Sequence, residues 1–325
     1  MEEMNLKTKI DIFSGFLGAG KTMLIKKLIK EKLQVENLVI IENEFGEVGI
    51  DGSILKDSNV QVKEINAGCI CCTVTSDFNK SIKEVIERFK PTRIIIEPSG
   101  VGKLSDILKV CRGEDIRKLA EINMVITVVD GMKYHTYIKN FSEFYKNQIQ
   151  HANTLVISRS QKLSLYKLIE VVENLQKING KANIITTPWD SITGEKIIAL
   201  GEGKEKDNLE VVNLVKKPVA LVGVRTTVNH KANEVFQTVG IETPKTFSKK
   251  SLENFLKVLE KDSAYGTVLR AKGIVETEDK KWVQFDYVPD EFQIRESHAE
   301  YTGRVCIIGS GLNKEAIKKL FLNSK

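Results

Sequence analysis

Short apolar runs alternate with segments of helical periodicity along the first 200 residues of the chain. The apolar runs, each typical of a strand buried in a parallel sheet, lie at residues 9–14, 38–41, 93–96, 125–129, 154–157 and 183–186. Apolar residues at helical spacing predict helices after Thr22 and at residues 78–89, 134–150 and 165–178. Strands that alternate with helices predict an α/β fold, in which helices cover both faces of a parallel sheet.

The pattern changes after residues 201–208, which contain no apolar residue and are typical of a linker. Beyond them, strands are expected at residues 219–228, 268–275, 282–287 and 304–308, with helices at residues 252–259 and 314–322. Strands separated by turns predict a smaller α+β domain with a largely antiparallel sheet. We therefore expect a first domain at residues 1–200, a linker at 201–217 and a second domain at 218–325.

Residues 15–22, with the sequence GFLGAGKT, match the phosphate-binding pattern G-x-x-x-x-G-K-[ST] at every fixed position. An expected strand precedes them and an expected helix follows, which is the context that such a loop needs. Backbone N–H groups of the loop would bind phosphate oxygens, Lys21 would reach the β- and γ-phosphates, and Thr22 would hold Mg²⁺. The residues expected to bind the nucleotide are Gly15, Gly18, Ala19, Gly20, Lys21 and Thr22.

A second part of this site is expected where the strand at residues 93–96 ends. Glu97 follows that strand, at the place where a P-loop protein carries its second carboxylate associated with Mg²⁺. Gly100, three residues later, would let a backbone N–H approach the γ-phosphate. We expect Lys21, Thr22 and Glu97 to carry the catalytic roles, and no residue is identified as a catalytic base.

Three of the five cysteines, Cys69, Cys71 and Cys72, lie within four residues. Thiolates are soft ligands suited to Zn²⁺, Cu⁺ or iron–sulfur clusters, and in some geometries to cobalt or nickel. Because three thiolates so close in sequence cannot all fill ideal tetrahedral positions without strain, we expect an open or exchangeable metal site. Glu42, Glu44 and Glu47, in the acidic loop at residues 42–51, are candidates for an additional oxygen ligand.

Charge and composition favour a cytoplasmic protein that binds neither nucleic acid nor membrane. The net charge is +6, and the 49 basic and 43 acidic residues are interspersed rather than grouped in a basic stripe. No apolar run reaches membrane-spanning length, and the polar start of the chain is unlike a signal peptide. The cysteine pattern favours reduced thiols over a disulfide framework.

Four motifs, GFLGAGKT, ENEFGEVGID, GCICCT and EPSG, resemble in order and spacing those of the CobW-type P-loop GTPases, which are related to the HypB and UreG nickel-insertion GTPases. The similarity continues at residues 148–152, 270–273 and 303–309, so it covers nearly the whole chain. The resemblance implies a P-loop NTPase fold, and GTP hydrolysis coupled to delivery of Zn²⁺, Co²⁺ or a related ion to a client metalloprotein. It also implies a metal site formed by Cys71 with Glu42 and Glu47.

Two departures from the family pattern leave alternatives open. The chain has no His-rich run, so the resemblance does not extend to metal storage. The guanine-reading motif aligns with Ser158, Arg159, Ser160 and Gln161, where Arg replaces Lys and Gln replaces Asp. The Gln161 amide can accept from N6 and donate to N1 of adenine, whereas it can accept from only one of the two donors of guanine. ATP therefore remains an alternative to GTP. A reactivation factor for a corrinoid or other metalloenzyme, a nucleotide-binding scaffold with little hydrolysis, and homodimerisation also remain open.

Overall fold

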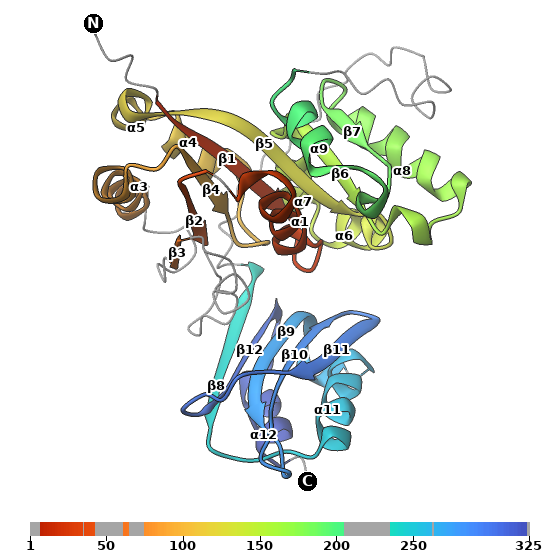
Figure 1. Ribbon diagram of the computed structural model, residues 1–325. Helices are drawn as coiled ribbons and strands as arrows, with labels where there is room; N and C mark the ends of the chain where they lie inside the picture. The colour runs from red at the N-terminus through yellow and green to blue at the C-terminus, as the bar shows by residue number, and fades with distance from the viewer. Residues whose placement is uncertain are drawn as a thin grey trace, which may run out of the picture. The chain divides into compact units, whose positions relative to one another are not determined.

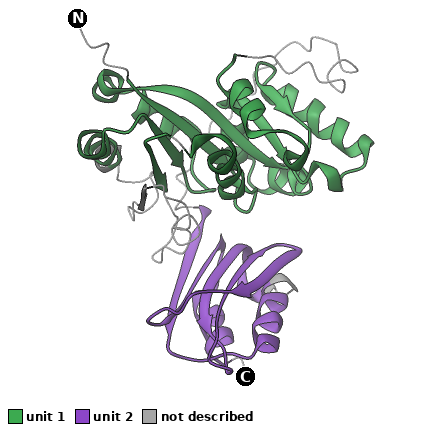
Figure 2. Cartoon of the chain, viewed as in Figure 1, with its two compact units in different colours: residues 1–43, 55–229 green, residues 44–54, 230–325 purple. Residues whose placement is uncertain are grey.

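The computed structural model describes residues 7–34, 36–42, 61–64, 75–204, 235–261 and 263–323. The chain divides into two compact units, with residues 1–43 and 55–229 in the first and residues 44–54 and 230–325 in the second (Figure 2). Residues 205–234 lie outside the described ranges, and the expected strand at 219–228 lies among them. The expected boundaries of the linker therefore stay a prediction.

The first unit is built on a seven-stranded sheet in the order β3-β2-β4-β1-β5-β6-β7, in which every pair of neighbours is parallel (Figure 1). Both faces of the sheet are covered, because Ile12 and Phe13 are adjacent on β1, point to opposite faces and are fully buried. The expected parallel α/β fold is confirmed. The strands are β1 (Thr8–Gly15), β2 (Leu38–Glu42), β3 (Gln61–Glu64), β4 (Arg93–Glu97), β5 (Ala120–Asp130), β6 (Thr154–Ser158) and β7 (Asn183–Ile185).

Helices follow the strands of this unit in the alternation that the sequence predicts. The α-helices are α1 (Lys21–Leu28), α3 (Thr75–Phe89), α4 (Leu104–Cys111), α5 (Glu114–Leu119), α6 (Tyr134–Asn140), α7 (Ser142–Gln150), α8 (Leu165–Ile178) and α9 (Gly194–Gly201). A π-helical turn, η1 (Ile29–Leu33), continues α1, and short 3₁₀ turns form η2 (Ser160–Lys162) and η3 (Trp189–Ser191).

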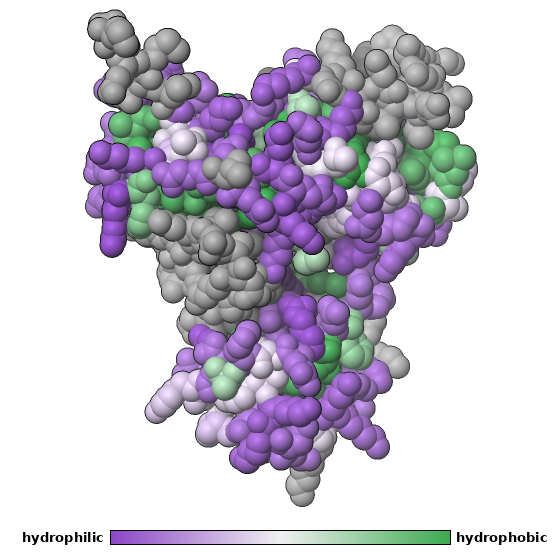
Figure 3. Space-filling model, viewed as in Figure 1, coloured by the Kyte–Doolittle hydropathy of each residue, from purple (hydrophilic) through white to green (hydrophobic). Residues whose placement is uncertain are grey.

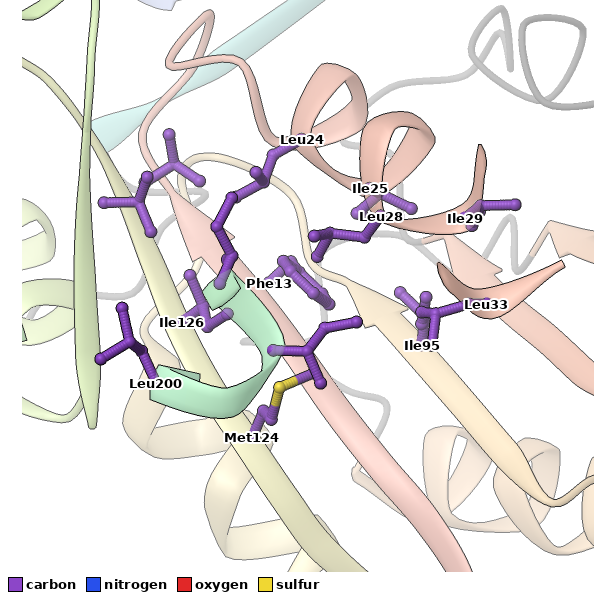
Figure 4. Close-up of a cluster of buried hydrophobic side chains, with 14 of the residues drawn as sticks. Phe13, Leu24, Ile25, Leu28, Ile29, Leu33, Ile95, Met124, Ile126 and Leu200 are labelled. Carbon is purple, nitrogen blue, oxygen red and sulfur yellow. The ribbon is translucent and has the colours of Figure 1, made fainter. Parts of the chain in front are cut away.

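One face of the sheet is packed against α1, η1 and α9. Leu24, Ile25 and Leu28 of α1 meet Phe13 of β1 and Ile126 of β5 in a single buried cluster (Figure 4). Each of these side chains is removed from water, which contributes on the order of 2 kcal/mol per residue to folding. The cluster fixes the direction of α1, and so the orientation of the loop that joins β1 to α1.

The structure corrects several expected elements. The single helix expected at residues 134–150 is two helices, because the chain leaves the helical conformation at Phe141 (φ −131°, ψ 35°). The strand β5 begins at Ala120, five residues before the expected start at Val125. The elements β3, α4, α5 and α9 were not expected, since each is too short for its periodicity to stand out from the surrounding sequence.

The second unit contains a five-stranded sheet in the order β11-β10-β9-β12-β8, in which every described pair is antiparallel. Apolar residues of α11 and α12, including Phe255 and Phe321, pack against alternate residues of the sheet such as Phe285 and Val305. The expected antiparallel α+β domain is confirmed, whereas β8 and β11 were not expected. The elements are β8 (Gln237–Thr243), α11 (Lys249–Lys261), η5 (Ser263–Tyr265), β9 (Thr267–Glu276), β10 (Trp282–Val288), β11 (Glu291–Glu296), β12 (Gly303–Ser310) and α12 (Lys314–Asn323).

The surface shown in Figure 3 mixes hydrophilic and hydrophobic residues, as the interspersed charges in the sequence predict. Among the described residues, no helix combines the length and the apolar character needed to span a bilayer.

A buried ionic network joins three central strands to the end of α9. The guanidinium of Arg93, the first residue of β4, pairs with Asp11 of β1, with Glu36 (Nε to Oε2, 2.7 Å) and with Glu202 (Nη2 to Oε1, 3.5 Å). The amide of Asn123 on β5 donates to Asp11 (2.8 Å) and to Glu202 (3.1 Å). Because Asp11 is fully buried, Arg93 is needed to balance its charge.

We expect Arg93→Leu to lower the free energy of unfolding of the first unit by about 3–5 kcal/mol, because it leaves the fully buried carboxylate of Asp11 without its cation. Urea denaturation followed by circular dichroism measures the loss. Lys83→Ala is the control, since it removes an exposed pair with Asp115 and should cost less than about 1 kcal/mol. Equal losses in the two variants would contradict a special role for the buried network.

Candidate functional site

The loop between β1 and α1 has a backbone that only glycine adopts readily. Gly15, Gly18 and Gly20 have φ angles of +142°, +69° and +101°. A Cβ atom on Gly15 would lie 2.4 Å from the carbonyl oxygen of Val128, so any larger residue would push β1 away from β5. The glycines of the predicted phosphate-binding pattern therefore allow both the turn and its close contact with the sheet.

The side chain of Lys21 folds back over this loop. Its Nζ donates to the carbonyl oxygens of Gly15 (3.0 Å) and Phe16 (3.4 Å), and the residue is only 5% exposed. Since Lys21 is also the first residue of α1, the positive end of that helix lies at the same place. Two sources of positive potential thus coincide at the carboxyl end of β1, an arrangement suited to polyphosphate.

The residues predicted to hold Mg²⁺ are in direct contact. The Thr22 hydroxyl donates to Oε1 of Glu97 at 2.8 Å, so the first turn of α1 is joined to the end of β4. Glu42, at the end of β2, is the register partner of Glu97, and its side chain is buried. Two carboxylates and a hydroxyl at one edge of the sheet are oxygen ligands of the kind that hard cations prefer.

Gly100 is held against the phosphate-binding loop by Gln148 of α7. A Cβ atom on Gly100 would lie 2.6 Å from the backbone nitrogen of Leu17. The buried Gln148 amide donates to the carbonyl oxygens of Gly100 (3.1 Å) and Gly102 (2.9 Å). In the sequence, the one signal for Gln148 is its place in the family-like stretch at residues 148–152.

An aromatic cluster packs against Phe16 of the phosphate-binding loop. The ring of Phe16 lies 4.6 Å from that of Tyr137, 5.3 Å from that of Phe141 and 5.8 Å from that of Tyr145, measured between centroids. The Tyr137 hydroxyl also donates to the carbonyl oxygen of Leu17 (3.4 Å). Sequence reasoning missed this support, although aromatic residues recur three or four positions apart through α6 and into α7.

The segment expected to read the base reaches the loop through Arg159. Its Nη1 donates to the carbonyl oxygen of Gly18 (3.1 Å) and to Oδ2 of Asp130 at the end of β5 (2.9 Å). Burial raises the pKa of the Asp130 carboxyl, an effect opposed by the charge of Arg159 and by backbone N–H groups. Ser158 is buried at the end of β6, whereas Gln161 is exposed in η2. Arg159 therefore touches the loop, while the role of Gln161 stays a prediction.

Residues 9–186, more than half of the chain, match the family model described as the CobW/HypB/UreG nucleotide-binding domain. The chain belongs to this family. Residues 236–325 also match the cobalamin synthesis protein cobW C-terminal domain, which corresponds to the second unit. The predicted family resemblance is confirmed for both parts of the chain.

Several curated relatives of this CobW/HypB/UreG protein are named for zinc. The zinc chaperone YeiR of Escherichia coli is 31% identical over 155 residues, covering 48% of this chain and 47% of YeiR. The zinc chaperone CobW of Sinorhizobium sp is 27% identical over 230 residues (62% and 65%). The zinc-regulated GTPase metalloprotein activator 1 of Schizosaccharomyces pombe is 23% identical over 314 residues (88% and 76%). The chain thus spans about half to two thirds of the length of the first two relatives.

Two of the solved structures to which the chain is similar are described as bound to a metal ion. The Zn(II)-bound YjiA GTPase from E. coli has a TM-score of 0.46 and 17% identity, with 98% of this chain and 99% of that chain covered. HypB from Helicobacter pylori in complex with nickel has a TM-score of 0.44 and 16% identity, with 63% and 92% covered.

One of the five predicted transition-metal ligands of this CobW/HypB/UreG chain lies among the described residues. Cys69, Cys71, Cys72 and Glu47 lie outside the described residues, so only Glu42 can be placed. Within the described ranges, no group of three His, Cys, Asp or Glu side chains is placed to hold a metal ion. Cys111 and Cys306 are buried, and burial raises the pKa of the Cys111 thiol to about 12, so this thiol stays protonated.

We expect Thr22→Val to weaken nucleotide binding at least about tenfold in the presence of Mg²⁺, because it removes the hydroxyl beside Glu97. Calorimetric titration with Mg²⁺ and with EDTA measures the effect, and Thr22→Ser, which keeps the hydroxyl, should bind as the wild type does. An equal loss in EDTA would show that Thr22 acts through packing rather than through the cation.

A second prediction concerns Gln161. Gln161→Asp should raise the preference for GTP over ATP by about 1–3 kcal/mol, because a carboxylate accepts from both donors on the guanine edge, whereas an amide accepts only one. Equilibrium binding of both nucleotides to the wild type and the variant provides the measurement. Strong GTP selectivity in the wild type, unchanged by the substitution, would mean that another segment reads the base.

Proposed function

We propose that this chain is a GTP-dependent metallochaperone. It binds GTP with Mg²⁺, hydrolyses it slowly, and uses the cycle to deliver Zn²⁺, Co²⁺ or a related ion to a client metalloprotein. The names of its relatives, zinc chaperones and a GTPase metalloprotein activator, support this proposal. The structural observation that carries it is the parallel arrangement of β3, β2, β4 and β1. Their carboxyl ends lie side by side at one end of the sheet.

The pairing of these strands ties the cysteine stretch to the nucleotide site. Glu42 is the register partner of Glu97 on one side and of Glu64, the last residue of β3, on the other. Cys69 follows Glu64 by five residues, so the chain cannot carry it farther than about 18 Å from the end of β3. The corresponding limit is about 29 Å for Cys72. These limits support the proposal that the cysteines act near the carboxyl ends of the strands, where Thr22 contacts Glu97.

The described residues fit a nucleotide with Mg²⁺. Thr22 and Glu97 would hold the ion, which would supply positive charge to the β- and γ-phosphates. Lys21 would exchange its two carbonyl contacts for phosphate oxygens, and the backbone N–H groups of the loop would bind the remaining oxygens. Gln148 would keep Gly100 beside the loop. No side chain among these is placed as a general base, which is consistent with slow turnover.

Coupling would act through Glu42, which is both the last residue of β2 and the first residue of the acidic loop at residues 42–51. A change of charge at the Thr22–Glu97 pair would change the electrostatic potential at the neighbouring carboxylate of Glu42. Water screens this effect only weakly, because Glu42 is buried and Glu97 is partly buried. Binding and hydrolysis of the nucleotide would thereby alter the affinity of the cysteine and acidic loops for their ion.

Anaerobic Co²⁺ titration, with and without a non-hydrolysable GTP analogue, tests the proposal. The wild type should bind about one ion with a thiolate charge-transfer band, and the analogue should change the affinity for Co²⁺. Cys71→Ser should abolish the band, whereas Cys111→Ala, which removes a buried thiol outside the cluster, should leave it unchanged. Lys21→Ala should bind Co²⁺ but lose the effect of the analogue.

Two outcomes would contradict the proposal. Absence of the thiolate band, or a band indifferent to Cys71→Ser, would rule out delivery of an ion by the cysteines. A wild type that binds GTP and Co²⁺ but shows no turnover, with or without Zn²⁺, would indicate a nucleotide-binding scaffold instead.

A further inference from the structure

The loop that follows β7 places a tryptophan against the phosphate-binding loop. Trp189, the first residue of η3, lies so close to Gly20 that a Cβ atom there would be 2.7 Å from Cη2 and 3.4 Å from Cζ2 of the indole. Trp189 is half-buried, and it also packs on the apolar cluster formed by α1, α9 and the sheet. The indole thus joins the edge of the core to the backbone of the phosphate-binding loop, and part of its surface remains exposed.

The order of the strands distinguishes the two sides of the phosphate-binding loop. Thr22 and Glu97, the pair suited to the cation, lie on the β4 side of β1. On the opposite side, the order continues through β5, β6 and β7, and Arg159 after β6 reaches the loop at Gly18. A nucleotide with its γ-phosphate toward Glu97 would extend its base in the opposite direction, toward the loops that follow β6 and β7. Trp189 lies in the second of these loops.

We propose that Trp189 forms a wall of the nucleotide pocket and packs against the face of the purine base; this inference rests on the proposed nucleotide function. Every purine has an aromatic face, so contact with an indole supports binding without distinguishing the hydrogen-bonding edges of guanine and adenine. This contact compensates for the exposed, neutral Gln161 at the position where the edge would be read. The pocket then selects a purine triphosphate and discriminates weakly between GTP and ATP.

Calorimetry with GTP, ATP and inorganic tripolyphosphate, each with Mg²⁺, tests the inference. Trp189→Leu should weaken GTP and ATP binding by a similar factor of at least about ten, since both lose the same stacking contact. It should leave tripolyphosphate binding unchanged, because that ligand has no base. Trp189→Phe, which keeps an aromatic face, should recover most of the affinity for both nucleotides.

Ile192→Ala is the matched control, because Ile192 follows η3 in the same connection and packs on the same apolar cluster. It should lower stability without changing the ratio of nucleotide affinity to tripolyphosphate affinity. Emission of Trp189, recorded in a Trp282→Phe background that leaves a single tryptophan, should change with GTP and ATP but not with tripolyphosphate. This measurement needs no substitution at Trp189 itself, so it holds even where Trp189→Leu fails to fold.

The possible failures are distinguishable. An equal loss of tripolyphosphate and nucleotide affinity in Trp189→Leu would show that the indole only supports the loop. A much larger loss for GTP than for ATP would show that the loop after β7 reads the edge of the base. If the wild type bound none of the three ligands, the proposed function would fail as well, whereas normal binding that is indifferent to Trp189 would overturn this inference alone.

Discussion

The close approach of other segments to three glycines, by backbone at Gly15 and Gly100 and by a side chain at Gly20, is the constraint on which the site depends. A Cβ atom would lie 2.4 Å from β5 at Gly15, 2.6 Å from Leu17 at Gly100, and 2.7 Å from the indole of Trp189 at Gly20. These contacts bring the sheet, the loop after β4 and the loop after β7 against residues 15–22. Lys21 and Thr22 can then meet partners from distant parts of the sequence, and the buried cluster beneath α1 keeps them in place.

Strand order divides the chemistry along one edge of the sheet. Carboxylates end β2 and β4 on one side of the phosphate-binding loop, while Arg159 and Trp189 follow β6 and β7 on the other. Acidic residues suit a cation, whereas a planar guanidinium and an indole suit an aromatic base. A bound cation would therefore lie on the side where β2 and β4 end. The purine would lie on the side of the loops that follow β6 and β7.

Where sequence reasoning failed, the missing information was about contacts between distant segments. Gln148 and Tyr137 carry no local signature, because their partners, Gly100 and Leu17, lie far from them in sequence. The break between α6 and α7 at Phe141 was missed because the apolar periodicity continues across it. Trp189 reads in the sequence as one more apolar residue near a proline, and only its contact with Gly20 connects it to the loop.

The sequence by itself determined the α/β alternation, the phosphate-binding loop, the family and the antiparallel second unit. Those features rest on local periodicity and on fixed spacings within short motifs, and both can be recognised without knowledge of the fold. Only the tertiary structure decided that Glu42 pairs in register with Glu97, that Arg159 reaches Gly18, and that Trp189 covers Gly20. The reason is that strand order and register depend on the packing of the whole sheet, and no single segment carries that information.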